Sequence, residues 1–187
     1  MMKYTIKWLL EKVEEENRIK YLFFWGHQPQ KDGTIGATCM SQWFDQDCSF
    51  VVDGIRYQTA EHWMMAEKAR LFDDPEMVER ILASNSAAKA KKLGRLVHNF
   101  DTEKWEANAF EIVKQGSIHK FGQNPPLKEY LLNTNNRVLV EASPLDKIWG
   151  IGLAKDHEHA AQPAFWQGRN LLGFALMEAR DVLAENR

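Results

Sequence analysis

Helix-start signals recur along the middle of the chain and constrain its fold more than any other feature. Between residues 59 and 124, residues that favour the cap position each precede a helix-forming stretch. Two of them stand directly before a proline, which is well tolerated in a first helical turn. We therefore predict successive helices over 59–72, from 74, over 86–94, over 101–122 and over 124–133. The capping residues are Thr59, Asp74, Ser86, Asp101 and Asn124.

Shorter patterns flank this helical block and predict a small amount of β-structure. Residues 20–26 and 137–142 have the composition and alternation of strands, and 49–57 form a hairpin around an Asp-Gly turn at 53–54. Amphipathic helices over 4–18 and 168–183 are expected near the two ends. The sequence thus predicts an α+β fold, a mostly helical single domain with a small β-sheet.

Composition limits the class of protein. The 187 residues are 44% hydrophobic and 27% charged, which suits one domain with a substantial core. A net charge of −2 argues against a dedicated nucleic-acid coat or a polybasic membrane binder. Cys39 and Cys48 are the only cysteines, too few for a disulfide framework, and no apolar run is long enough to span a membrane. We expect a cytoplasmic protein without a membrane partner.

The helix predicted over 59–72 carries an acid and a base on its apolar face. At 100° per residue, Glu61 and Lys68 fall in the stripe that also holds Met64, Met65 and Phe72. The pair is seven residues apart, which is too far for the salt bridge that neighbours at i and i+4 form. A buried carboxyl can exchange protons near neutral pH, and a desolvated lysine can act as a nucleophile. Alternatively, both side chains reach the surface or pair with charges from other helices.

Three further places could bind a ligand. In 144–152, Asp146 and Trp149 precede Gly150 and Gly152, glycines that either let a backbone approach a ligand or only form a tight turn. The stretch 168–173 opens the last helix and either binds phosphate or only starts the helix. The strand over 20–26 ends in aromatic residues beside a loop, where side chains often stack on ligands. The candidate binding residues are Trp25, Gly26, His27, Asp146, Trp149, Gly150, Gly152, Gly168 and Asn170.

No metal site is predicted. The Asp-His-Glu-His stretch at 156–159 lacks the spacing of metal ligands along a helix and has no partner motif, so we interpret it as a solvated loop. Lys89, Lys91, Lys92 and Arg95 cluster on the helix over 86–94 and are interpreted as a solvated face, with a DNA-facing patch as the alternative.

Seven segments, in order over residues 20–183, resemble the NADAR family. Each is short, and the set together is specific. They are Phe24-Trp25-Gly26-His27; Ser41-Gln42-Trp43-Phe44; Tyr57 with Thr59-Ala60-Glu61-His62-Trp63-Met64-Met65-Ala66-Glu67-Lys68-Ala69; Lys120-Phe121 with Gln123-Asn124-Pro125; Leu139-Val140-Glu141-Ala142-Ser143; Asp146 with Trp149-Gly150-Ile151-Gly152; and Gly168 with Asn170-Leu171-Leu172-Gly173. We divide the chain into an N-terminal helical extension, 1–19, and a NADAR domain, 20–187.

The resemblance implies N-glycosidase chemistry without a cofactor. Some members of the family cleave the C–N bond between a ribose phosphate and an aminopyrimidine of riboflavin biosynthesis, and others remove ADP-ribose from guanine in nucleic acid. The essential glutamate and lysine of the family correspond to Glu61 and Lys68, and its Asp-Trp-Gly segment corresponds to Asp146 and Trp149. The implied partner is a small nucleotide-like substrate, or an ADP-ribosylated nucleic acid. A non-catalytic module that binds ADP-ribose or NAD in the same pocket, and a structural partner protein, are the alternatives outside this class.

Overall fold

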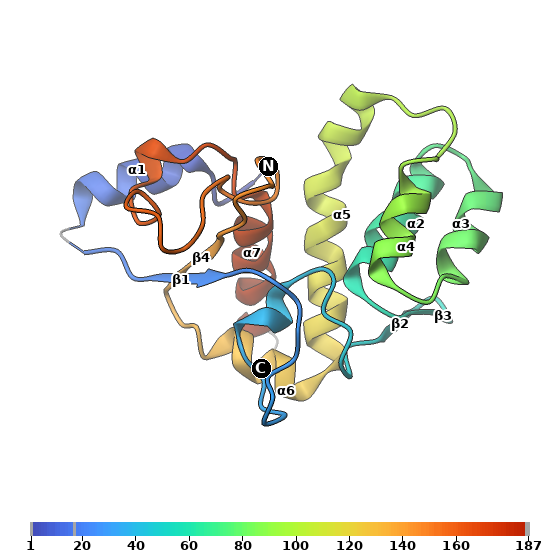
Figure 1. Cartoon of the computed structure of the whole chain (residues 1–187), viewed down its shortest axis with the longest axis horizontal. Coiled ribbons are helices and arrows are strands. Elements are labelled where there is room, and N and C mark those ends of the chain that lie inside the picture. The colour runs from blue at the N-terminus through green and yellow to red at the C-terminus, as the bar shows by residue number, and fades with distance from the viewer. Residues whose placement is uncertain (1, 17, 186–187) are drawn as a thin grey trace.

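The computed structural model describes residues 2–16 and 18–185, and in these ranges seven α-helices surround two small sheets (Figure 1). The helices are α1 (Ile6–Glu15), α2 (Ala60–Leu71), α3 (Pro75–Leu82), α4 (Ala87–Gly94), α5 (Thr102–Gln123), α6 (Pro125–Leu132) and α7 (Leu171–Glu185). The strands are β1 (Tyr21–Phe24), β2 (Phe50–Val52), β3 (Ile55–Tyr57) and β4 (Val138–Glu141). Two short 3-10 helices, η1 (Ala37–Met40) and η2 (Pro163–Phe165), lie in the connections. The predicted α+β class is confirmed.

The strands form two separate two-stranded sheets instead of one. β1 and β4 pair in parallel, with Tyr21 opposite Val138, although most of the chain lies between them. β2 and β3 form the predicted antiparallel hairpin. Asp53 and Gly54 both have positive φ, 50° and 78°, which is the backbone geometry that the favoured two-residue hairpin turn requires.

The caps predicted for the helical block begin the helices as expected. The side chains of Thr59, Asp74, Ser86 and Asp101 each accept a hydrogen bond from a backbone N–H in the first turn. Asn124 makes no such bond to α6 and instead donates from its Nδ2 to the carbonyl of Lys120, at 2.7 Å, near the end of α5. Helix α5 therefore continues through Gly122, where the sequence predicted its end.

α5 and α7 pack side by side in the middle of the molecule. Helices α2, α3 and α4 gather on one side of α5, and the β1–β4 sheet lies against α7 (Figure 1). The core is built from buried side chains of all these elements, among them Trp63, Phe121, Leu139 and Phe174. This arrangement places α2 and the β1–β4 sheet on opposite sides of the α5–α7 pair.

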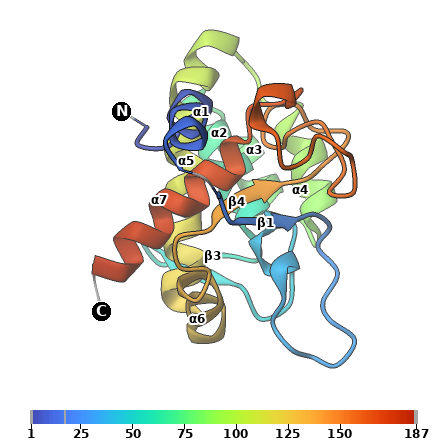
Figure 2. The ribbon, with the colours of Figure 1, turned by 90° about the vertical axis from the view of Figure 1, so that its left-hand side faces the viewer.

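α1 lies over α7 when the molecule is seen from the side of the β1–β4 sheet (Figure 2). The predicted helix over 4–18 is shorter in the structure, and residue 17 lies outside the described residues. Lys3 ties this end of the chain to α7, because its Nζ pairs with Asp181 at 2.5 Å and its backbone N–H donates to Glu178 at 2.6 Å. The division between an extension and a domain at residue 20 stays a prediction.

Candidate active site

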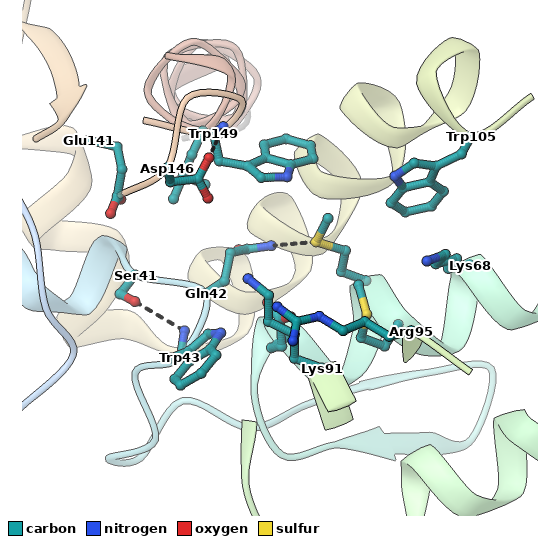
Figure 3. Close-up of a pocket in the computed structure, with 14 residues that line it drawn as sticks. Ser41, Gln42, Trp43, Lys68, Lys91, Arg95, Trp105, Glu141, Asp146 and Trp149 are labelled. Atoms are coloured by element: carbon teal, nitrogen blue, oxygen red, sulfur yellow. Dashed lines mark hydrogen bonds between the residues drawn. The ribbon is translucent and has the colours of Figure 1, made fainter. Parts of the chain in front are cut away.

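A cavity of about 200 Å³ lies where α2, α4 and α5 face the end of β4 and the loop that follows it (Figure 3). Acidic, basic and aromatic side chains from distant parts of the sequence meet in its wall. The wall is lined by Ser41, Gln42, Trp43, Glu61, Met64, Met65, Lys68, Lys91, Arg95, Trp105, Glu141, Asp146, Trp149 and Leu172. Four of the residues predicted from the sequence are therefore together in one place: Glu61, Lys68, Asp146 and Trp149.

Glu61 enters the cavity wall from the first turn of α2. The helix is fixed there by its Thr59 cap and by the backbone N–H of Glu61, which donates to the carbonyl of Gln42 at 3.0 Å. The side chain is 4% exposed, and its burial raises the pKa of the carboxyl to about 7. Hydrogen bonding from the Trp43 side chain and the charge of Lys91 oppose this rise without cancelling it. Glu61 can therefore both donate and accept a proton near neutral pH.

Lys68 lies two turns further along α2, between aromatic rings. Its Nζ is 4.3 Å from the centre of the Phe100 ring and 5.5 Å from that of Trp105. Partial burial, and then the positive charge of Arg95, lower the pKa of the Lys68 ammonium, while Glu61 acts in the opposite direction. A lysine with a lowered pKa has a larger fraction of the neutral amine, which is the nucleophilic form.

Lys91 and Arg95 give the cavity a basic side. They lie one turn apart at the end of α4, and both lower the pKa of Glu61 through their charge. Figure 3 shows them next to each other below Gln42, with Lys68 to their right. The solvated-face interpretation of this cluster is incomplete, because α4 packs against α2 and both residues line the cavity, with Lys91 partly buried and Arg95 still exposed. Lys89 and Lys92 are exposed, as expected.

Gln42 and Trp43 come from the loop after η1, and a buried lysine holds that loop. Lys120 of α5 is 1% exposed and donates from its Nζ to the carbonyls of Cys39, at 2.6 Å, and Ser41, at 2.8 Å. Burial lowers the pKa of this ammonium. Both Gln42 and Trp43 stand in a segment that carries the family resemblance, but the sequence assigned them no role.

The loop after β4 supplies the remaining polar wall. One carboxylate oxygen of Asp146 accepts the backbone N–H groups of Ile148, at 2.8 Å, and Trp149, at 2.7 Å, so that the side chain fixes the turn carrying the Trp149 ring. Glu141, the last residue of β4, also lines the cavity. Glu141 and Trp105 were not predicted as site residues either, because nothing in the local sequence marks which face of β4 or α5 reaches this cavity.

The glycines and the asparagine predicted to bind a ligand make the contacts of this loop with the rest of the chain. A Cβ at Gly150 would stand 2.9 Å from the carbonyl of Glu141, and one at Gly168 only 2.3 Å from the carbonyl of Gly150. Gly152 has φ +69°, which suits a tight turn. The close approach that these glycines allow is thus between segments of this chain.

Asn170 is fully buried, with φ 52°, and bridges α7 to β4. It donates from Nδ2 to Leu139 at 2.9 Å and accepts the backbone N–H of Glu141 at 3.0 Å. The predicted helix over 168–183 therefore begins only at Leu171. The N–H groups of Leu171 and Leu172 donate to the carbonyls of Ile148 and Trp149, so they are already paired within the chain.

Trp25, Gly26 and His27 are not among the residues that line the cavity. Trp25 is 54% exposed and lines a different hollow with Gln30, Thr38 and Lys155. Gly26 has φ 81°, and the His27 ring is 5.6 Å from that of Trp43. His27 is thus next to one residue of the cavity wall.

In residues 2–16 and 18–185, no group of three or more His, Cys, Asp or Glu side chains is arranged to hold a metal ion. Within the same ranges, no helix is long and apolar enough to cross a membrane. Cys39 and Cys48 are both buried thiols, and burial raises the pKa of Cys39 to about 11.

On this α+β scaffold, an acid, a lysine and aromatic rings line one cavity, which is the arrangement of an enzyme active site, and comparison with known proteins specifies the class. The NADAR domain matches residues 23–184, and the chain belongs to this family. It is 41% identical over 165 residues to an N-glycosidase of Acanthamoeba polyphaga mimivirus, covering 87% of this chain and 95% of the relative.

Two further relatives and one solved structure are also similar to this chain. The N-glycosidase YbiA of Escherichia coli is 32% identical over 71% of this chain and 74% of its own length. The NMR structure of the same protein superposes with a TM-score of 0.68 over 90% of this chain and 89% of that chain, at 27% identity. A riboflavin biosynthesis protein of Vibrio vulnificus is 34% identical over 74% of this chain, which spans 34% of that longer relative. This chain is therefore an enzyme that acts on N-glycosyl bonds, as the sequence predicted.

Proposed function

We propose that this N-glycosidase hydrolyses the C–N bond between a ribose phosphate and an aminopyrimidine of riboflavin biosynthesis. The observation that carries the proposal is the placement of Glu61 and Lys68 in the wall of one cavity. The pKa of Glu61 is raised and that of Lys68 is lowered, and both shifts favour the neutral form of the side chain. The name of the Vibrio relative supports the choice of substrate.

The reaction runs through a covalent intermediate on Lys68. The ring C–O bond at the anomeric carbon breaks first: its electron pair passes to the ring oxygen, which takes a proton from Glu61, and the anomeric carbon becomes doubly bonded to the base nitrogen. The neutral amine of Lys68 adds to this carbon and returns a proton to Glu61, and the bond to the base nitrogen then breaks with its electron pair passing to nitrogen. A Schiff base between Lys68 and the sugar results, and water hydrolyses it to release the sugar phosphate and restore the amine. Glu61 moves protons in these steps, for which a carboxyl that titrates near neutral pH is suited.

The other residues of the cavity bind the two ends of the substrate. Trp149 stacks on the base, and its position is fixed by Asp146. Lys91 and Arg95 attract the phosphate, because they are the cationic side chains beside Lys68 in the wall. Because Lys91 and Arg95 bind the phosphate, Lys68 is not needed for phosphate binding and can act as the nucleophile.

A second candidate function is removal of ADP-ribose from guanine in nucleic acid. The observation that favours it is the continuation of the basic surface from Lys91 and Arg95 to the exposed Lys89 and Lys92 on the same helix. This candidate uses the same Glu61 and Lys68 and differs in the substrate alone.

A paired cleavage assay on the purified chain distinguishes the two. One reaction contains the ribosylaminopyrimidine phosphate and the other an oligonucleotide carrying ADP-ribosyl-guanine, and the released sugar is identified by mass spectrometry. We expect ribose 5-phosphate in the first reaction and nothing in the second. Release of ADP-ribose alone would replace the proposal by the second candidate, and inactivity in both by a folded chain would refute both.

Variants show whether the activity belongs to this cavity. Glu61→Gln and Lys68→Met should each reduce turnover by about 100-fold or more, the size of effect that loss of an acid–base group commonly has. Glu67→Gln is the matched control, because Glu67 is on the same helix, pairs with Arg70 and does not line the cavity. Normal turnover in Lys68→Met would exclude the covalent route.

A further inference from the structure

Glu141 is a carboxyl in the cavity wall that the steps above do not use. It is the last residue of β4, and it reaches the cavity from the side opposite α2. Among the residues that the structure describes, its buried Oε2 has no hydrogen-bond partner. Buried polar atoms are seldom left unpaired, and those that are often have a part in binding or catalysis.

The backbone around Glu141 is held firmly on both sides. Its N–H donates to Oδ1 of Asn170 at 3.0 Å, and its carbonyl accepts the N–H of Ile151 at 3.0 Å. Gly150 packs directly on the same carbonyl. Asn170 and the loop at Gly150 and Ile151 therefore fix the position of the Glu141 backbone. The side chain extends toward the cavity from a defined point, as a catalytic group must.

The surroundings favour the protonated form of this carboxyl. Burial, and then the negative charge of Asp146, raise the pKa of Glu141 to about 8, and Lys91 acts against them. The other charged groups of the cavity wall are Glu61 and Lys68 from α2 and Arg95 from the end of α4. A glutamic acid that stays protonated at neutral pH is a proton donor.

Figure 3 shows Glu141 beside Asp146 and Trp149, with Lys68 on the far side of the cavity next to Trp105. A substrate whose sugar carbon meets Lys68 and whose base stacks on Trp149 has its C–N bond in the cavity between Lys68 and Glu141. We propose that Glu141 is the general acid of the reaction and protonates the departing base nitrogen, an inference that rests on the proposed N-glycosidase reaction at this site.

The proton balance closes without a further reactant. As the C–N bond breaks and its electron pair passes to nitrogen, Glu141 gives that nitrogen its proton and becomes a carboxylate. The water that hydrolyses the Schiff base supplies the oxygen of the released sugar, and a proton from this water returns to Glu141. The sum is addition of one water across the C–N bond.

The test is the pH dependence of turnover in the full chain and in Glu141→Gln, with Glu178→Gln as a control. Glu178 is also a buried glutamate but pairs with Lys114, outside the cavity. Wild-type activity should fall as the pH rises past about 8, where Glu141 ionises. Glu141→Gln should lose about 100-fold in kcat with KM little changed and should lack this alkaline decline, while Glu178→Gln follows wild type.

A measurement without substrate separates the two proposals. In the chain labelled with ¹³C-glutamate, the Glu141 carboxyl signal, assigned by its loss in Glu141→Gln, should titrate above pH 7. A signal that shows an ionised carboxyl at pH 6 overturns the role of Glu141 regardless of the substrate. An active wild type with an equally active Glu141→Gln also overturns it and leaves the proposed function intact, whereas an inactive wild type refutes the proposed function and this role with it.

Discussion

Replacing Glu61 with glutamine should stabilise the fold at alkaline pH and at the same time remove activity. Burial raises the pKa of the Glu61 carboxyl from 4.5 to about 7, so the folded state favours the neutral acid. The stability that this gives is complete below pH 4.5 and is lost as the pH rises to about 7. A shift of this size corresponds to about 3 kcal/mol. Glutamine cannot ionise, so Glu61→Gln keeps that stability, and its side-chain oxygen can still accept from Trp43.

The assay is urea denaturation at pH 4.5 and pH 8, followed by circular dichroism. We expect wild type and Glu61→Gln to have similar free energies of unfolding at pH 4.5, and the variant to be more stable by about 3 kcal/mol at pH 8. Glu67→Gln, a change of the same kind further along α2, controls for effects on the helix itself. A difference that does not depend on pH, or a variant less stable than wild type at pH 8, would refute the burial argument.

Other changes test the framework that positions the site, each by urea denaturation. Gly173→Ala should destabilise the fold by about 2 kcal/mol or more, because the new Cβ would stand 2.1 Å from a backbone oxygen of β4; equal stability of this variant and wild type would contradict that contact. Gly122→Ala, whose Cβ meets only a leucine methyl at 3.3 Å, should be neutral or stabilise α5 by up to about 1 kcal/mol. Asn170→Ala should cost about 2–4 kcal/mol by leaving two buried backbone groups of β4 unpaired, and a loss below about 0.5 kcal/mol would speak against this bridge. Lys120→Met should both destabilise the fold by about 2 kcal/mol or more and lower turnover, since it frees the loop that carries Trp43; unchanged turnover would show that the loop keeps its place without this lysine.

Local signals predicted the helices and the acid–base face of α2. A capping residue and a spacing of seven along one helix are properties of a short segment, so the sequence alone places Glu61 and Lys68 on one side of α2. The Asp-Gly turn of the β2–β3 hairpin is equally local. His62 lies outside that apolar stripe, so the projection of α2 does not by itself predict its burial. This residue is 1% exposed, because α3 and α4 cover that side of α2 as well.

The remainder of the site depends on contacts between distant segments. Lys91 and Arg95 reach the cavity only because α4 packs on α2, and Glu141 only because β4 pairs with β1 across more than a hundred residues. The stretch at Gly168 and Asn170 looked like a phosphate-binding helix start. Its neighbouring N–H groups are instead taken by carbonyls of the loop that carries Trp149, which no local pattern reveals.

Borohydride trapping followed by peptide mass spectrometry tests the covalent role of Lys68 most directly. The chain is incubated with the ribosylaminopyrimidine phosphate and reduced during turnover, with Lys68→Met treated in parallel. We expect one reduced pentose-phosphate adduct on the peptide that contains Lys68, and none in the variant. Continued turnover without an adduct on that peptide, or an adduct that persists in Lys68→Met, would contradict the assignment of Lys68 as the nucleophile.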